Sequence, residues 1–309
     1  MNIGVLCNSK SCLPSVHTLL QLGQKVWICL PDQKVEDHLE IQQFAYQFGI
    51  QVIKLKKETL DRDLVLWKEQ HNLNFIFVVT FPFILSANLL ASINVDIINF
   101  HFAPLPHFKG AQPVFWLIKN GEKTGGITAH IMTEKIDGGG IIHFAPYTLS
   151  SVETYNSYMN NVAFLNTKVI QIIIDKISNK HWKNSLKKQK SSSSVYYPKP
   201  QLEDIRIHWA KMDAEEIERL CRACNPWNKG AIAVFNQQAI KLVEVTVLPN
   251  SAKQEPAGTL VLINETKRLA ISCRDNKYLE INIAYQEELG FFSNNRLSQL
   301  GLTAGLSLQ

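Results

Sequence analysis

The chain has 309 residues, of which 46% are hydrophobic and 19% charged, with 32 basic and 27 acidic side chains. This length is sufficient for about two domains and a sizeable buried core, which excludes a scaffold that depends on disulfides. No apolar stretch reaches the roughly 18 to 20 residues of a membrane span, and the run 3–7 lacks the basic flank and cleavage site of a signal peptide. We therefore expect a cytoplasmic protein with no membrane partner.

Short apolar runs alternate with amphipathic stretches through the first hundred residues. Strands are predicted at 3–7, 26–30, 52–55, 75–79 and 97–101, and helices at about 14–22, 36–48, 58–70 and 86–93. Such alternation predicts a parallel sheet wrapped by helices, a Rossmann-like α/β domain. Gly49 suits a left-handed cap after the second helix. The segment 8–12 contains no glycine, which disfavours a nicotinamide cofactor because the phosphate-cradling turn is missing.

A long helical stretch at about 152–177 closes the first predicted domain. Further along, Asp213 and Glu216 have the spacing of a capping box and predict a helix to about residue 224. Apolar runs then follow at 231–235, 240–248, 259–262, 269–273 and 278–284, spaced like the strands of a small antiparallel barrel. The predicted organisation is an α/β domain at 1–182, a linker at 183–204 and a β-barrel domain at 205–309.

The formal charge of +5 is concentrated in the predicted linker. Residues 1–182 hold 15 basic and 14 acidic side chains, residues 183–204 hold 5 and 2, and the remainder holds 12 and 11. Together with the serine run 191–194, this composition predicts a flexible, solvated connector. Phosphate contacts by Lys187, Lys188 and Lys190 are the alternative.

Six cysteines lie in apolar segments, and we expect them to be reduced core residues. Cys221 and Cys224 have the spacing of a metal-ligand pair. No second pair of Cys or His lies nearby in the sequence, however, and a structural zinc site needs four ligands. We therefore predict no metal.

Polar side chains end the buried strand predicted at 95–101. Asn99 and His101 close this strand, and ligand sites in open α/β sheets lie at such carboxyl ends. Asp137 stands later in the chain, directly before three glycines. Each residue also has an ordinary structural explanation: Asn99 as a turn former, His101 as an interior histidine, and Asp137 as a turn residue.

Several short motifs resemble those of the formyltransferases that use 10-formyltetrahydrofolate. They are Asn-Phe-His-Phe-Ala-Pro-Leu-Pro at 99–106, Phe-Lys-Gly at 108–110, Gly-Ile-Thr-Ala-His at 126–130 and Ile-Asp-Gly-Gly at 136–139. The run 222–227 also resembles the start of the C-terminal barrel domain in methionyl-tRNA formyltransferases and some sugar formyltransferases. The resemblance covers most of the chain and implies a Rossmann-like formyltransferase domain followed by a small OB-like β-barrel.

The resemblance also implies roles for particular residues. Asn99, His101 and Asp137 fall on the family's catalytic Asn, His and Asp. The family's folate lies between two loops, which here contain Thr80, Phe81, Pro82, Phe83, Ile84 and Leu85 on one side and Ile136, Gly138 and Gly139 on the other. The glycines would let backbone approach the pterin, and buried core is the alternative role for 80–85. Substrate contacts are expected from Pro106, Gly110 and Gln112, whereas His130 is expected to be structural.

Transfer of a formyl group to an amine requires an oxyanion to be stabilised and protons to be moved. Asn99 would donate its side-chain N–H to the oxyanion, where loss of such a donor costs about 3 to 4 kcal/mol of barrier. His101, with an ordinary pKa of about 6.5, would hydrogen-bond the same oxygen or relay a proton. Asp137 would orient His101 and accept the proton of the attacking amine, directly or through water.

Two departures from methionyl-tRNA formyltransferases concern the acceptor. Residues 103–106 read Ala-Pro-Leu-Pro where those enzymes usually have Ser-Leu-Leu-Pro, and residues 31–37 are short and not basic where they carry a basic insertion that engages tRNA. Because polyanion affinity depends on several phosphate contacts, we favour a small biosynthetic amine, either an amino sugar nucleotide or an amino-acid-derived metabolite. The alternatives are methionyl-tRNA formyltransferase, a formyltetrahydrofolate hydrolase and a non-catalytic binding protein. The motifs leave the oligomeric state and the tail 300–309 unassigned.

Overall fold

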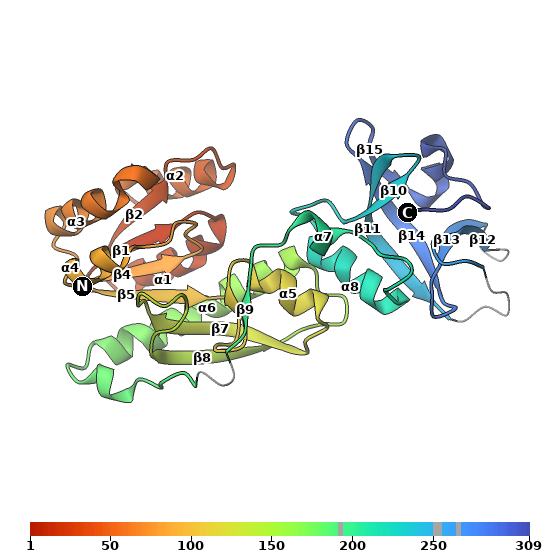
Figure 1. Ribbon diagram of the computed structural model, residues 1–309. Helices are drawn as coiled ribbons and strands as arrows, with labels where there is room; N and C mark the ends of the chain where they lie inside the picture. The colour runs from red at the N-terminus through yellow and green to blue at the C-terminus, as the bar shows by residue number, and fades with distance from the viewer. Residues whose placement is uncertain (191–193, 250–254, 264–266) are drawn as a thin grey trace. The chain divides into compact units, whose positions relative to one another are not determined.

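The computed structural model describes residues 1–190, 194–249, 255–263 and 267–309 (Figure 1). These residues form two compact units, each with its own sheet. The first unit contains Met1–Ala111, Thr124–Thr148 and Met159–Tyr197. The second contains Gln112–Lys123, Leu149–Tyr158 and Pro198–Gln309.

The first unit is built on a seven-stranded sheet in the order β3-β2-β1-β4-β5-β7-β8. Its strands are β1 (Asn2–Cys7), β2 (Lys25–Pro31), β3 (Val52–Leu55), β4 (Phe75–Val79), β5 (Asp96–His101), β7 (Thr124–Ile131) and β8 (Ile141–Thr148). The strands β1 to β5 are parallel, as the alternation predicts, whereas β7 pairs antiparallel with both β5 and β8. The expectation of a parallel sheet is therefore incomplete, because an antiparallel hairpin extends it beside β5.

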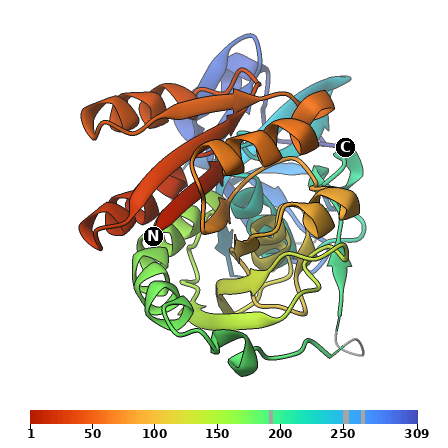
Figure 2. The ribbon, with the colours of Figure 1, turned by 90° about the vertical axis from the view of Figure 1, so that its left-hand side faces the viewer.

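Helices connect the parallel strands and run alongside them (Figure 2). They are α1 (Leu13–Gln21), α2 (Asp37–Gln47), α3 (Leu60–Gln70) and α4 (Ala87–Ser92), and the long helix after β8 is α6 (Tyr155–Ile177). In α3, the buried residues Leu60, Leu64 and Trp67 recur at the spacing of one helix face and join a core cluster with side chains of the strands. Gly49 follows α2 with a φ of +64°, as predicted.

The predicted linker 183–204 makes backbone contacts with the first unit. Lys187 forms both hydrogen bonds of an antiparallel bridge with Ile141, at 2.9 Å each, and β9 (Tyr196–Tyr197) pairs with β6 (Lys109–Gly110). The side chains of Lys187 and Tyr196 are exposed, but the backbone of these residues pairs with the rest of the unit. Of the serine run, Ser191 to Ser193 lie outside the described residues.

The second unit combines α-helices with an antiparallel sheet in the order β10-β11-β14-β13-β12, to which β15 is added beside β14. The helices are α5 (Pro113–Lys119), α7 (Leu202–Ile205) and α8 (Ala214–Cys224). The strands are β10 (Ala231–Phe235), β11 (Gln238–Leu248), β12 (Leu260–Ile263), β13 (Arg268–Ser272), β14 (Tyr278–Gln286) and β15 (Gly290–Ser293). The strands β10 to β14 lie on the predicted apolar runs, and β15 is additional.

The tail 300–309 joins the two ends of this sheet. Gln309 exchanges both backbone hydrogen bonds with Val234 of β10, at 2.8 Å each. Leu308 donates its N–H to the carbonyl of Gly258, just before β12, at 2.9 Å. Because β10 and β12 are the two ends of the strand order, the tail connects them, in the manner of the expected barrel.

Two local predictions in the second unit concern α8. The capping box is present, since Asp213 Oδ1 accepts the N–H of Glu216 and Glu216 Oε2 accepts the N–H of Asp213, each at 2.8 Å. Cys221 and Cys224 are buried and free, as are the other four cysteines. Among the described residues, no group of three or more His, Cys, Asp or Glu is arranged to hold a metal ion. In the same part of the chain, no helix has the length and apolar character needed to cross a membrane.

Candidate active site

The side chains of Asn99, His101 and Asp137 converge in the first unit. Asn99 and His101 are alternate residues of β5 and so project from the same face of the sheet. Asp137 lies in the turn between β7 and β8 with a φ of +47°, a left-handed conformation. This turn folds back so that Asp137 Oδ1 lies 3.4 Å from Asn99 Nδ2 and 3.8 Å from His101 Nδ1. The three residues predicted from motifs are therefore neighbours in space.

The Asp137 carboxylate is buried, with 11% of the side chain exposed, yet it remains ionised. Besides its contacts with Asn99 and His101, its Oδ1 lies 3.5 Å from His130 Nε2, and its Oδ2 accepts the N–H of Gly110 at 2.8 Å. Burial by itself would raise the pKa of Asp137, but the two histidines and the Gly110 amide together hold this pKa well below its ordinary value. Asp137 is consequently a carboxylate at neutral pH and a weak base.

His101 is neutral at neutral pH and has a defined tautomer. Its Nε2 lies 2.5 Å from the carbonyl oxygen of Phe108, and since a carbonyl can only accept, Nε2 carries the proton. Burial lowers the pKa of His101, while the nearby Asp137 carboxylate partly opposes this effect. The Nδ1 atom therefore keeps its lone pair on the side of Asp137.

His130 is a fourth member of this cluster, although we expected it to be structural. It is buried in β7, directly opposite Asn99 in the pairing of β5 with β7. Its Nδ1 donates to the carbonyl of Ile131 at 3.0 Å, so its Nε2 accepts an N–H of Asn99 at 3.1 Å. Within the described ranges, the second N–H of Asn99 has only the long contact to Asp137. The motif contains this histidine, but its register against Asn99 appears only in the folded chain.

The glycines after Asp137 are required by the turn itself. A Cβ on Gly139 would lie 1.8 Å from the carbonyl oxygen of Ile131, and a Cβ on Gly138 would lie 2.8 Å from the Cβ of Lys135. A side chain would force the chain to shift at either position, whatever ligand approaches. The close approach of the chain to itself is thus a reason for these glycines that is independent of the expected folate.

Gln189, from the predicted linker, holds the same turn. Its side-chain Nε2 donates to the carbonyl oxygens of Asp137 and Gly139, each at 2.8 Å. The amide thereby uses both of its N–H groups to tie the backbone on either side of Gly138. We did not expect this contact, because the composition around residue 189 is typical of a solvated connector.

The residues expected to contact substrate have different positions. Gly110, whose N–H binds Asp137, has a φ of +102°, and a Cβ there would lie 2.2 Å from the carbonyl oxygen of Tyr197. Pro106 follows a cis peptide bond, and its carbonyl accepts the N–H of Val195 at 3.4 Å. Both residues therefore shape the loop beside the cluster. Gln112 belongs to the second unit, where it precedes α5 in a left-handed conformation.

The loop 80–85 follows β4, the strand that pairs with β5. Leu85 is buried and Phe81 and Phe83 pack against the core, with their ring centroids 5.4 Å apart, whereas 75% of Ile84 is exposed. Buried core is therefore an adequate explanation for only part of this loop. Ile84 also lines an open pocket of about 460 Å³ together with residues 57–62 and Ser86.

Comparisons with known proteins agree across both units. Residues 32–174 match the family described as Formyl transferase, and residues 200–288 match Formyl transferase, C-terminal domain. The methionyl-tRNA formyltransferase of Clostridium beijerinckii is 30% identical over 230 residues, which cover 74% of this chain and 71% of that protein.

Two solved structures share the fold. HypX from Aquifex aeolicus, in complex with tetrahydrofolic acid, has a TM-score of 0.67 at 17% identity; the match covers 96% of this chain and spans 46% of HypX. WlaRD, a sugar 3N-formyl transferase in the presence of dTDP and 5-N-formyl-THF, has a TM-score of 0.66 at 18% identity, covering 91% of this chain and 96% of that one. Together with the matches in sequence, these findings place the chain in the formyltransferase family, and it is an enzyme that transfers formyl groups.

Proposed function

We propose that the protein transfers the formyl group of 10-formyltetrahydrofolate to a primary amine of a small biosynthetic substrate, such as an amino sugar on a nucleotide carrier or an amino-acid-derived metabolite. The observation that carries this proposal is the cluster of an ionised Asp137, a neutral His101 and an Asn99 with one weakly held N–H. This combination supplies a donor for the formyl oxygen and acceptors for the protons of an amine.

Asn99 stabilises the negative charge that develops on the formyl oxygen as the amine attacks. One of its N–H groups is held by His130 at 3.1 Å, which fixes the orientation of the amide. The other N–H makes a long contact of 3.4 Å with Asp137, and it turns to the substrate oxygen at little cost. The role of His130 is thus to orient the donor.

Asp137 and His101 manage the positive charge and the proton of the amine. Forming the new N–C bond leaves the amine nitrogen positively charged, and the Asp137 carboxylate stabilises that charge. Because the pKa of Asp137 is held so low, it retains a proton poorly, and Nδ1 of neutral His101 is the better acceptor. The proton then passes to the folate nitrogen as the old C–N bond breaks.

The loops beside β5 suit the co-substrate, which supplies the formyl group. The first follows β4 and contains Thr80 to Leu85, and the second contains Ile136, Gly138 and Gly139 around Asp137. Ile84 and Ile136 are 75% and 44% exposed, so both loops present apolar surface to a flat heteroaromatic ring.

The start of α2 and the loop after β1, which contact each other, support a small acceptor. Asp37, at the start of α2, accepts hydrogen bonds from Ser9 Oγ at 2.8 Å and from the N–H of Lys10 at 2.9 Å. The ammonium of Lys10 pairs with Glu40 at 2.7 Å. The cation Lys10 is therefore paired with a carboxylate, whereas the binding of a nucleic acid backbone depends on several uncompensated cations. The sugar formyltransferase WlaRD, which shares the fold, is in keeping with this acceptor class.

Methionyl-tRNA is the second candidate acceptor. The observation that favours it is the 30% identity with an enzyme named methionyl-tRNA formyltransferase. The chemistry at Asn99, His101 and Asp137 is the same for both acceptors, so the cluster does not separate them. Only the surface that receives the rest of the acceptor differs.

The test is the release of tetrahydrofolate from 10-formyltetrahydrofolate by the purified protein. Amino sugar nucleotides, a panel of small amines and methionyl-tRNA are assayed in parallel, with the Asp137→Asn variant as the inactive control. Turnover with a small amine supports the proposal. Turnover with methionyl-tRNA alone replaces the acceptor and keeps the chemistry. Formate released at the same rate without any amine would identify a hydrolase instead.

A further inference from the structure

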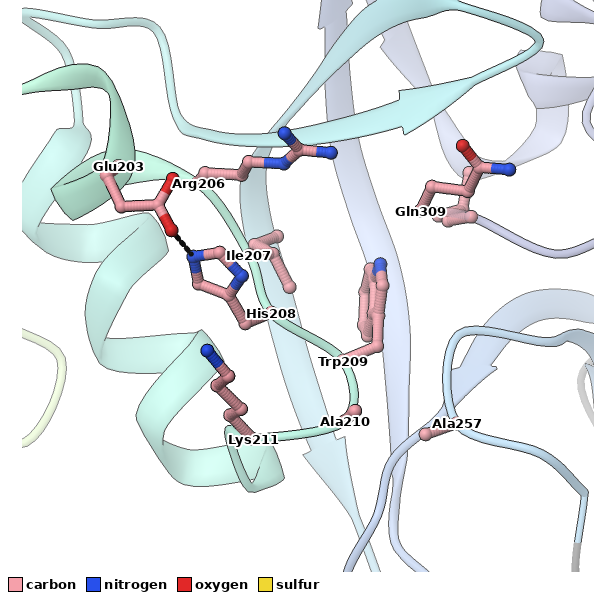
Figure 3. A pocket seen from close by; sticks show the side chains of 10 residues that line it. Glu203, Arg206, Ile207, His208, Trp209, Ala210, Lys211, Ala257 and Gln309 are labelled. Carbon is pink, nitrogen blue, oxygen red and sulfur yellow. Dashed lines mark ion pairs between the residues drawn. The ribbon is translucent and has the colours of Figure 1, made fainter.

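A pocket of about 650 Å³ opens in the second unit, between the segment that precedes α8 and the C-terminal tail (Figure 3). Its walls include Arg206, His208, Trp209 and Lys211 from the first of these segments, and Leu308 and Gln309 from the second. The cluster around Asp137 belongs to the first unit, so this pocket is a separate feature.

Trp209 brings a buried hydrogen-bond donor to the pocket. The residue is 6% exposed, and its indole Nε1–H has no acceptor in the described part of the chain. One face of the indole ring packs closely against Gly258, where an added Cβ would lie only 3.1 Å from Trp209 Cγ. Gly258 is in turn hydrogen-bonded to Leu308. In Figure 3 the indole nitrogen points toward the region between Arg206 and Gln309. A buried N–H without a partner is costly, so this group indicates an acceptor supplied from outside the chain.

Arg206 adds a charged donor to the same pocket. It is half-buried, and among the residues that the structure describes its guanidinium has no hydrogen-bond or ion-pair partner. The acidic side chain on the lining, Glu203, is engaged by His208 at 3.0 Å. Lys211 contributes a further cation to the lining. The lining therefore carries two cationic side chains against one acidic side chain, besides the unpartnered indole donor.

We propose that this pocket binds the phosphate group of a ligand. Arg206 would donate two parallel N–H groups to two phosphate oxygens, and the Trp209 indole would donate to a third. A phosphate fits better than a carboxylate, because its three terminal oxygens match the fork of the guanidinium and the separate indole donor. Three terminal oxygens are present in a phosphomonoester, such as a small phosphorylated metabolite, whereas the phosphodiester of a nucleic acid backbone has only two, so we assign the phosphate to a small metabolite.

Binding is measured by isothermal titration of the purified protein with inorganic phosphate and with pyrophosphate. Trp209→Phe removes the indole N–H while keeping an aromatic wall, and Arg206→Met removes the guanidinium while keeping an apolar stem. We expect Arg206→Met to weaken phosphate binding by about tenfold or more and Trp209→Phe to weaken it several-fold. Thermal unfolding of each variant establishes that it is folded.

Arg296→Met is the matched control, since Arg296 is exposed, lies outside the pocket and changes the net charge by the same amount. It should leave phosphate binding unchanged. An equal loss in Arg296→Met, or no binding of phosphate and pyrophosphate by the wild-type protein, would overturn the proposal. Competition by a phosphomonoester is the expected result, whereas competition by an oligonucleotide that lacks a terminal phosphate would contradict recognition through three terminal oxygens. Formyl transfer is not needed for any of these readouts, so the two proposals fail separately.

Discussion

Asp137 in the first unit and Asp213 in the second accept the same kind of hydrogen bond. Asp137 Oδ2 accepts the N–H of Gly110 at 2.8 Å, and Asp213 Oδ1 accepts the N–H of Glu216 at 2.8 Å. The partner of Asp213 lies three residues away on the first turn of α8, whereas the partner of Asp137 lies 27 residues away on another loop. One bond starts a helix, and the other joins two segments that the fold has brought together.

The difference between the two carboxylates lies in what surrounds them. Asp213 faces the start of a helix, where it satisfies an amide that would otherwise lack a partner. Asp137 is buried among Asn99, His101 and His130, so that its negative charge acts on side chains that can donate or accept a proton. The same hydrogen bond therefore serves stability at one site and reactivity at the other, and substitutions should separate the two roles.

The largest effect is expected from Asp137→Asn. This change keeps the shape of the side chain and removes the negative charge that faces the amine, so kcat should fall by about 10³-fold or more. The rate of tetrahydrofolate release in a single turnover measures it. Asp213→Asn is the matched control and should retain activity, because Asn also caps helices. Equal losses of activity in Asp137→Asn and Asp213→Asn would show that the two aspartates do not differ in their roles.

Asn99→Ala should have the second largest effect, a loss of about 10²- to 10³-fold in kcat with little change in KM. The substitution deletes the donor for the formyl oxygen and leaves Nε2 of His130 without its N–H partner. Steady-state kinetics give both constants. Asn295→Ala, at an exposed asparagine of the second unit, is the control. A rise in KM with kcat intact would assign Asn99 to substrate binding alone.

Gln189→Glu should lower kcat by about tenfold. It replaces the amide by a carboxylate that repels the carbonyl oxygens of Asp137 and Gly139, and displacement of a catalytic group by a fraction of an ångström has effects of this size. The pH profile of kcat should shift as well, because the surroundings of Asp137 change. The neighbouring exposed Lys188→Met should match the wild type in both readouts. Loss of stability without loss of kcat would show that Gln189 is merely structural.

Asp213→Ala should lower the free energy of unfolding by about 1 kcal/mol without affecting kcat at temperatures where the protein is folded. The side chain no longer accepts the N–H of Glu216. Urea denaturation measures the change, and Asp213→Asn should restore most of the stability. A large drop in activity at full folding would contradict a purely structural cap.

The smallest effect concerns pH. Burial lowers the pKa of His101, so the unfolded chain, with a His pKa of about 6.5, binds a proton more readily than the folded one. The free energy of unfolding should therefore decline as the pH falls below about 6.5. The lowered pKa of Asp137 acts in a separate window, since its stabilisation is lost only as the pH falls below about 4. His101→Gln should reduce the decline in the free energy of unfolding below about pH 6.5. An unchanged decline would show that another group causes it.

The sequence by itself determined the parts of this protein that depend on near neighbours. The alternation of apolar runs predicted the strands β1 to β5 and their helices, because burial of one face depends on a short repeat. The capping box of Asp213 and Glu216 was equally readable, since both of its bonds span three residues. The motifs also identified Asn99, His101 and Asp137 as a candidate set.

Only the tertiary structure decided how those residues meet. His130 joins the cluster through the register of β5 against β7, and Gln189 holds the Asp137 turn from a segment whose composition indicated solvent. Gln309, at the end of the tail, bonds to Val234 of β10, which is likewise distant from it in the sequence. Each of these contacts joins groups far apart in the chain. His130 meets the side chains of Asn99 and Asp137, whereas the partners of Gln189 and Gln309 are backbone carbonyls and amides that every residue carries. No local pattern specifies such a partner, because it exists only once the sheet, the turn and the tail have packed.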